Sequence, residues 1–127
     1  MSSGDYLLIV QDMQRHTRDI ARFFERFDVM LTPTMMIPPQ PLGYLNADKY
    51  TIVQAAQRMM SYTFFCFIAN GAGLPSASIP LHWNEDGLPI GVLATARAGG
   101  EELLFSLAAQ IERAWSWAAM MPGIVAA

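Results

Sequence analysis

Cysteine and histidine are scarce in this chain, and their scarcity excludes several kinds of site. Among 127 residues there is one cysteine, Cys66, and there are two histidines. A single cysteine excludes an intramolecular disulfide framework and any metal site built on paired cysteines. The cysteine content fits a reducing compartment, so we expect a cytoplasmic protein, and we expect neither a metal nor a cofactor.

Charged residues are also few. They make up 15% of the sequence, against 53% hydrophobic residues, and the formal net charge is −3. The eight lysine and arginine residues are scattered and form no basic stripe, so nucleic acid is not an expected partner. A chain this apolar departs from the usual composition of a free-standing soluble domain, which indicates that part of its apolar surface is buried against another surface.

Long hydrophobic runs are absent. The most apolar window, residues 62–75, is interrupted by Asn70, glycine and proline, and it is shorter than the roughly 20 residues that a membrane-spanning helix needs. The N-terminus carries Asp5 and only a short apolar run, unlike a signal or transit peptide. We therefore expect a single domain over residues 1–127, with no membrane span.

The hydrophobic pattern predicts three amphipathic helices, over about residues 3–27, 48–68 and 101–117. A short apolar run at 28–33, closed by Pro33, predicts a buried strand. Residues 33–46 are rich in proline and predict an extended loop. This loop either lies over a pocket or crosses the surface, and the second is the more common arrangement.

The tripeptide Gly-Leu-Pro occurs twice, at 73–75 and 87–89, and each copy precedes an extended run. Residues 76–81 alternate, residues 88–96 form the second run, and Asp86-Gly87 between them suits a hairpin turn. The glycines after Asn70 end the preceding helix. The sequence therefore predicts a mixed α/β fold in the order α-β-α-β-β-α, with a β-hairpin near residues 76–96. The two tripeptides mark strand starts and are not a repeat.

The spacing of reactive side chains predicts no catalytic constellation. His16 and His82 stand alone, without the spacing of metal ligands. Cys66 lies in an apolar helix, where a thiol is normally a small buried hydrophobe. Ser76 and Ser78 lack the Gly-x-Ser-x-Gly elbow of hydrolases, and the one lysine is beside no serine motif.

Three blocks nevertheless resemble, in order and spacing, the C-terminal segment of the amidase signature family. They read FDVMLTPT, IANGAGLPSASIPLHWNEDGLPIGV and GGEELLFSLAAQIERAWSW, within roughly residues 22 to 117. The chain departs from the family at Leu93, where glutamine is common, and at Ala96, near a usual glycine. The second block is the most specific, and its structural motif positions are Asn70, Gly73, Pro75, Gly87, Pro89 and Gly91.

The resemblance implies hydrolysis of amide or ester bonds by a serine, cis-serine and lysine triad, with backbone N–H groups that hold the oxyanion. In the family these groups lie in the N-terminal half, so the resemblance implies no catalytic residue in this chain. It also implies that the end of the second predicted helix borders the acyl side of the active site. Thr63, Phe67 and Ile68 are the expected substrate-binding residues, with plain core packing as the alternative. Apolar side chains there favour an uncharged acyl group.

Two functions stay open at this point. The chain is either the noncatalytic C-terminal portion of an amidase, whose full-length parent acts on a small-molecule amide, or a free-standing binding or self-associating module of the same fold. The proline-rich MIPPQPLG loop is similar to that of bacterial amidases that include hydrolases of linear and cyclic oligoamides. In either case exposed apolar surface predicts association, including a possible homo-oligomer.

Overall fold

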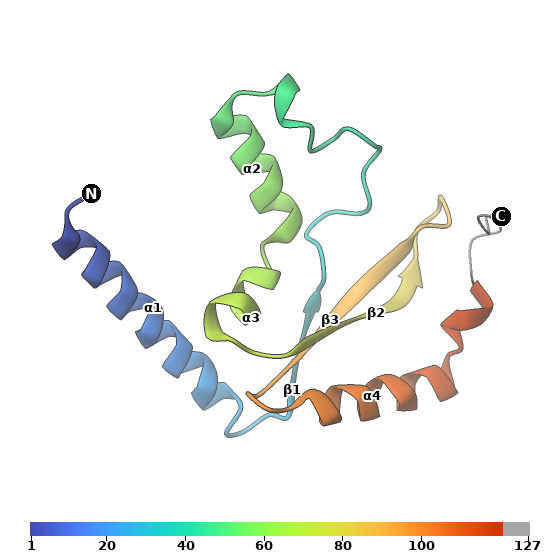
Figure 1. Ribbon diagram of the computed structural model, residues 1–127. Helices are drawn as coiled ribbons and strands as arrows, with labels where there is room; N and C mark the ends of the chain where they lie inside the picture. The colour runs from blue at the N-terminus through green and yellow to red at the C-terminus, as the bar shows by residue number, and fades with distance from the viewer. Residues whose placement is uncertain (121–127) are drawn as a thin grey trace.

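The computed structural model describes residues 1–120, and it forms a three-stranded sheet with helices on both sides (Figure 1). The predicted mixed α/β fold and hairpin are confirmed, and one predicted helix is divided in two. The helices and strands are, in chain order, α1 Ser3–Phe23, β1 Val29–Pro33, α2 Ile52–Thr63, α3 Cys66–Ala72, β2 Ser76–Trp83, β3 Pro89–Ala96 and α4 Glu101–Ala114, with short 3-10 helices at Ala47–Lys49 and Trp117–Met120.

The sheet is antiparallel, and its strand order is β1-β3-β2. The last strand in the sequence is therefore the central one. Leu93 of β3 lies opposite both Thr32 of β1 and Ser78 of β2, so these three side chains share one face of the sheet. A register shift between Pro80 and His82 marks a bulge near the end of the hairpin.

The core lies between the sheet and α4, which runs along one face of the sheet (Figure 1). Ile79, Ala94, Ala96 and Leu104 are buried there. Ala77 and Leu81 pack against this cluster, so the alternation predicted for β2 is confirmed. Ala96 faces Gly100 so closely that a Cβ on that glycine would lie 2.8 Å from the Ala96 Cβ. The small residues at this corner let α4 approach the sheet.

The helix ends differ from those predicted. The α1 helix ends at Phe23 instead of Phe27, because the N–H of Phe24 and the two that follow donate to carbonyls three residues back. The predicted helix at 48–68 begins later, at a capping box of Thr51 and Gln54. It then divides after Thr63, where similar tight bonds replace the regular pattern. No proline or glycine marks this division, so periodicity could not reveal it.

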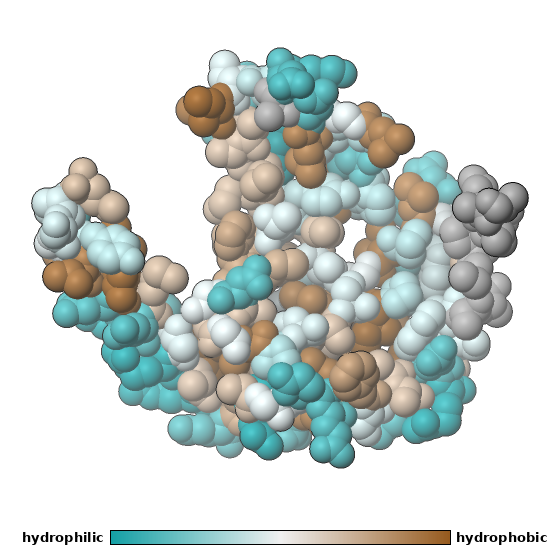
Figure 2. Space-filling view, viewed as in Figure 1, coloured by the Kyte–Doolittle hydropathy of each residue, from teal (hydrophilic) through white to brown (hydrophobic). Residues whose placement is uncertain are grey.

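Much of the apolar surface of the chain is uncovered. Neither α1 nor α2 contains a buried residue, and α1 extends away from the sheet beside α3 (Figure 1). Figure 2 shows hydrophobic surface over the N-terminal part of α1 and over α2. The accessible surface is 9591 Å², whereas a compact monomer of this length exposes about 6,700 Å². The chain thus has far more surface than an independently packed domain needs.

A search of residues 1–120 finds no helix that is both long enough and apolar enough to span a membrane.

Candidate functional site

The first candidate site is a depression of about 320 Å³ between α1 and α3. Thr17, one of the lining residues, joins the two helices: its hydroxyl donates to the carbonyl of Met13 at 3.0 Å and lies 3.4 Å from that of Gly71. Its lining is largely apolar and includes no carboxylate. The lining residues are Met13, His16, Thr17, Ile20, Phe64, Phe67, Ile68 and Gly71.

Two of the three expected substrate-binding residues meet in this depression. Phe67, which is 50% exposed, and the half-buried Ile68 both line it. Thr63 is not in the lining, and its hydroxyl donates within α2 to the carbonyl of Met59 at 3.0 Å. The structure therefore brings Phe67 and Ile68 together and leaves Thr63 apart from them. Their contact with substrate stays a prediction.

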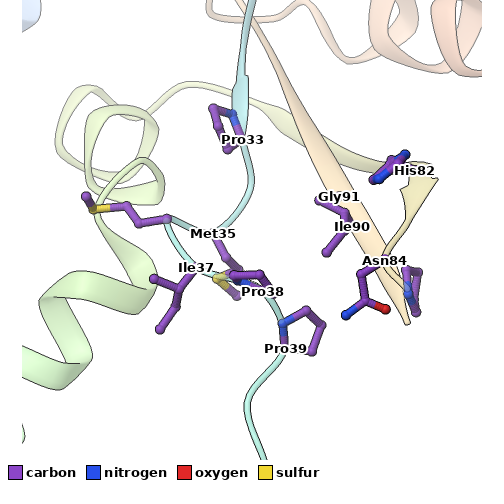
Figure 3. A pocket seen from close by; sticks show the side chains of 11 residues that line it. Pro33, Met35, Ile37, Pro38, Pro39, His82, Asn84, Ile90 and Gly91 are labelled. Atoms are coloured by element: carbon purple, nitrogen blue, oxygen red, sulfur yellow. The ribbon is translucent and has the colours of Figure 1, made fainter. Parts of the chain in front are cut away.

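The second candidate site is a groove of about 380 Å³ between the proline-rich loop and the β2–β3 hairpin. Figure 3 shows loop residues on one side and hairpin residues on the other. The proline-rich loop thus lies along a depression, although a plain crossing of the surface is the more common arrangement of loops. The lining residues are Pro33, Met35, Met36, Ile37, Pro38 and Pro39 of the loop side and His82, Asn84, Pro89, Ile90 and Gly91 of the hairpin.

The groove is apolar apart from His82 and Asn84. The Asn84 side-chain oxygen accepts the N–H of Leu88 at 2.7 Å, so it is already used in the hairpin turn. The groove can therefore offer a neutral, apolar surface with one imidazole at its edge. Such a lining suits an uncharged group, because an unpaired charge is costly to desolvate.

Two motif glycines occupy left-handed backbone conformations. Gly73 ends α3 with a φ of +66°, and its N–H points to the carbonyl of Asn70 at 3.4 Å. Gly87 in the hairpin has a φ of +74° and donates to the carbonyl of Asn84 at 3.0 Å. Side chains other than glycine are strained at such angles, so these positions shape the backbone on either side of β2.

The remaining motif positions are Pro75, directly before β2, and Pro89 and Gly91 in β3. The Pro75 carbonyl accepts the N–H of Ala96 at 3.1 Å, which joins the start of β2 to the end of β3. Pro89 begins β3 opposite Trp83 and also lines the groove. Gly91 lies on the groove side of β3.

Thr34 has three anchors and was not among the residues that the sequence singled out. Its N–H donates to the carbonyl of Gly91 at 3.0 Å, and its hydroxyl lies 2.7 Å from that of Ser78. Its carbonyl accepts the Cys66 thiol at 3.6 Å. Because Thr34 follows one outer strand and Ser78 lies on the other, their meeting depends on the register of the sheet, which the sequence alone does not reveal.

The potentially reactive side chains are dispersed. His16 lines the first depression and His82 the second. Cys66 is half-buried and begins α3, where its thiol is engaged with Thr34. Over residues 1–120 no three metal-ligating side chains gather into a possible metal site. The described part of the chain therefore has two largely apolar depressions but no recognisable catalytic constellation.

Comparisons with known proteins identify the family. The model of the family described as "Amidase" matches residues 1–105. The protein named "Putative amidase AmiC" of Mycobacterium tuberculosis is 36% identical over 111 residues, which are 87% of this chain and 23% of the relative. The 6-aminohexanoate-cyclic-dimer hydrolase of Paenarthrobacter ureafaciens is 30% identical over 122 residues, with 91% of this chain and 25% of the relative covered.

Solved structures share the fold. The structure of a 6-aminohexanoate cyclic dimer hydrolase superposes with a TM-score of 0.85 at 28% identity, covering 97% of this chain and 27% of that one. A glutamyl-tRNA(Gln) amidotransferase subunit from Thermotoga maritima matches with a TM-score of 0.54 at 22% identity, which shows likeness of fold alone; the match covers 72% of this chain and 18% of that one.

The chain spans about a quarter of the length of the curated relatives it matches. The family model covers most of the chain, and the resemblance seen in its three sequence blocks is confirmed by these relatives and by the solved hydrolase structure. The chain accordingly belongs to the amidase family.

Proposed function

We propose that this chain is the C-terminal portion of an amidase, and that it contributes to amide hydrolysis by forming core and part of the substrate pocket. In this proposal residues 1–127 form one structural unit, which is inactive alone. The attacking group, the base and the oxyanion donors come from the remainder of a full-length parent.

The observation that carries the proposal is the unequal coverage in the structural match. Nearly the whole chain, 97%, superposes on only 27% of a 6-aminohexanoate cyclic dimer hydrolase. The described residues keep this fold although they hold no catalytic constellation, as expected if the chemistry belongs to another part of the enzyme. The alternative of a free-standing module is not favoured, since the relatives named above are amidases or are named as such.

The uncovered apolar surface supports the same proposal. Leu7 and Leu8 of α1 are 60% and 62% exposed, and Ile52 of α2 is 90% exposed. In water such a surface favours burial against another surface, at about 25 cal/mol per Å². The remainder of an amidase is the proposed cover. A second copy of the chain is the substitute expected when that remainder is absent, so the isolated chain should form homo-oligomers, which sedimentation velocity would detect.

The proposed substrate is a small, uncharged carboxylic amide, linear or cyclic. Phe67 and Ile68 provide an apolar wall in the depression between α1 and α3, where no carboxylate is present to pair with a cationic substrate. Thr63 is the last residue of α2 and lies shortly before Phe67 and Ile68 in the chain, so it stays a proposed substrate-binding residue. The related hydrolases are named for the cyclic dimer of 6-aminohexanoate, and such a substrate is consistent with this class.

We further propose that the protein acts in the cytoplasm and needs no cofactor or metal. The support is indirect: one cysteine in 127 residues suits a reducing compartment, and the proposed chemistry uses side chains alone.

Hydrolysis assays on the protein at its natural length and on the isolated chain test the proposal. Release of ammonia or carboxylic acid from simple amides is expected of the first and not of the second. Hydrolysis by the isolated chain, abolished by a substitution of one of its own residues, would overturn the proposal that the catalytic groups lie outside this chain. A natural-length protein without activity on any amide would overturn the amidase function itself.

A further inference from the structure

Thr34 is where β1 passes into the proline-rich loop, and three other elements hold it there. Its N–H is bound by the Gly91 carbonyl of β3, its hydroxyl by Ser78 of β2, and its carbonyl by Cys66 of α3. Both polar backbone groups and the side chain of one residue are thus engaged by three separate segments. A residue held in this way has little freedom to shift along or away from the sheet.

The segment that follows Thr34 forms one wall of the groove. Met35, Met36, Ile37 and the two prolines after them line it directly (Figure 3). The opposite wall belongs to the hairpin, which is itself fixed by strand pairing between β2 and β3. The width of the groove therefore depends on where Thr34 places the beginning of the loop.

Gly91 makes the anchor possible. A Cβ built on it would lie 2.5 Å from the Ser78 hydroxyl oxygen and 2.6 Å from that of Thr34. Real Cβ atoms do not come so close to other atoms, so any side chain at this position would drive the two hydroxyls apart. The central strand thus leaves open the space in which the two hydroxyls meet.

We propose that Thr34 is a positioning residue for substrate selection: through Ser78 and over Gly91, it fixes the loop wall of the groove and so sets which neutral amides the groove admits. The inference rests on the proposed amidase function and assigns the groove the outer part of a long apolar arm, in addition to the apolar wall proposed for Phe67 and Ile68 between α1 and α3. The groove suits such an arm because its lining is apolar and carries no carboxylate, lysine or arginine. The role of Thr34 is to hold the wall; it performs no chemical step.

The test uses three variants at the natural length of the protein. Thr34→Val removes the hydroxyl and keeps the volume, Ser78→Ala removes its partner, and Thr34→Ser restores a hydroxyl. Ser76→Ala is the matched control, because the Ser76 hydroxyl lies 2.8 Å from that of Thr95 on the same face of the sheet but does not line the groove. Kinetics with straight-chain amides from propanamide to octanamide are combined with hydrogen exchange of residues 35–46.

We expect Thr34→Val and Ser78→Ala to raise KM for the longer amides by about two- to tenfold, the range that the loss of one hydrogen bond supports, with kcat nearly unchanged. Residues 35–46 should exchange faster in both variants. The double variant should be no worse than either single one, since both remove the same bond. Thr34→Ser and Ser76→Ala should both behave like the unsubstituted protein.

The proposal is overturned if kcat falls together with kcat/KM for all amides, if Ser76→Ala gives the same KM change, or if Thr34→Ser does not restore the parent values. An unsubstituted natural-length protein that hydrolyses no amide would contradict the proposed function instead. The hydrogen-exchange rates of residues 35–46 would then still decide whether Thr34 anchors the loop: equal rates in Thr34→Val and Thr34→Ser would show that it does not.

Discussion

The guanidinium of Arg58 lies over the ring of Tyr50, with its central carbon 4.0 Å from the ring centroid. The same guanidinium carbon is 4.5 Å from the ring centroid of Tyr44, and Nη1 donates to the Tyr44 carbonyl at 3.4 Å. One side chain of α2 thus binds both tyrosines of the segment that leads into the helix. This contact holds the far end of the proline-rich loop, as Thr34 holds its beginning.

Replacement of Arg58 should release this end of the loop. We expect Arg58→Ala to lower the free energy of unfolding by about 1 kcal/mol, from the loss of cation–π contact and one hydrogen bond. Arg58→Lys should recover only part of it, because an ammonium lacks the planar face. Urea denaturation measures the change. Arg18→Ala on exposed α1 is the control, and a loss of equal size there would contradict the account.

Two glycines should respond to alanine in opposite directions. At Gly91 the new methyl would clash with the hydroxyls of Ser78 and Thr34, so Gly91→Ala should destabilise the protein by about 1 to 3 kcal/mol. At Gly71 in α3 nothing lies within 4 Å of the added atom, and alanine is the better helix former. Gly71→Ala should therefore stabilise by about 0.5 to 1 kcal/mol. Thermal unfolding of both variants checks the contrast, which fails if both move the same way.

The proposed contact of Phe67 with the acyl chain of the substrate predicts a change of substrate selectivity when this side chain is shortened. In the natural-length protein, Phe67→Ala should lower kcat/KM for long-chain amides relative to short ones by about five- to tenfold, because the exposed half of the Phe67 side chain is no longer there to contact the chain. Phe105→Ala on α4 is the matched control, as Phe105 is 77% exposed and lies outside the α1–α3 depression. Unchanged selectivity in the Phe67 variant would show that this ring serves packing alone.

The N-terminus of α1 should respond to acid. Two hydrogen bonds with Ser2 lower the pKa of Asp5 below its ordinary 3.8. The larger effect comes from the Ser2 backbone N–H, which donates to the Asp5 carboxylate at 2.7 Å, and the smaller from the Ser2 hydroxyl. Because the pKa of Asp5 is lower in the folded protein, the ionised Asp5 contributes its full stabilisation of the folded state above pH 3.8. This stabilisation is lost as the pH falls through the lower folded-state pKa. An NMR titration of the Asp5 carboxyl measures this pKa. Ser2→Ala should raise it, and a value at or above 3.8 in the parent would contradict the assignment.

Local sequence signals predicted the elements of this fold but not their partners. Alternation in residues 76–81 and the Asp86-Gly87 turn were sufficient to predict the hairpin. Nothing local could show that β1 pairs with β3, because that contact joins residues far apart in the sequence, such as Val29 and Ala96. The anchor at Thr34 was missed for the same reason, since it exists only once β1 and β2 flank β3.

The sequence indicated where one of the two depressions lies, whereas substrate contact at that depression stays a prediction. The family resemblance implied a substrate site at the end of the second predicted helix; Phe67 and Ile68 line a depression there, and Thr63 does not. The partner wall on α1 was not foreseen, because amphipathic periodicity shows which face is apolar but not what covers it. The proline content of residues 33–46 is compatible both with a loop over a pocket and with a loop across the surface, so it could not reveal the groove.

The central claim, that this chain supports an amidase without supplying its chemistry, is tested most directly by assaying the purified isolated chain for hydrolysis of hexanamide. The account predicts no release of ammonia above the buffer rate, while the natural-length protein hydrolyses the same amide. Hydrolysis by the isolated chain that disappears in His82→Ala or Cys66→Ser would contradict it and would place the catalytic groups within these 127 residues.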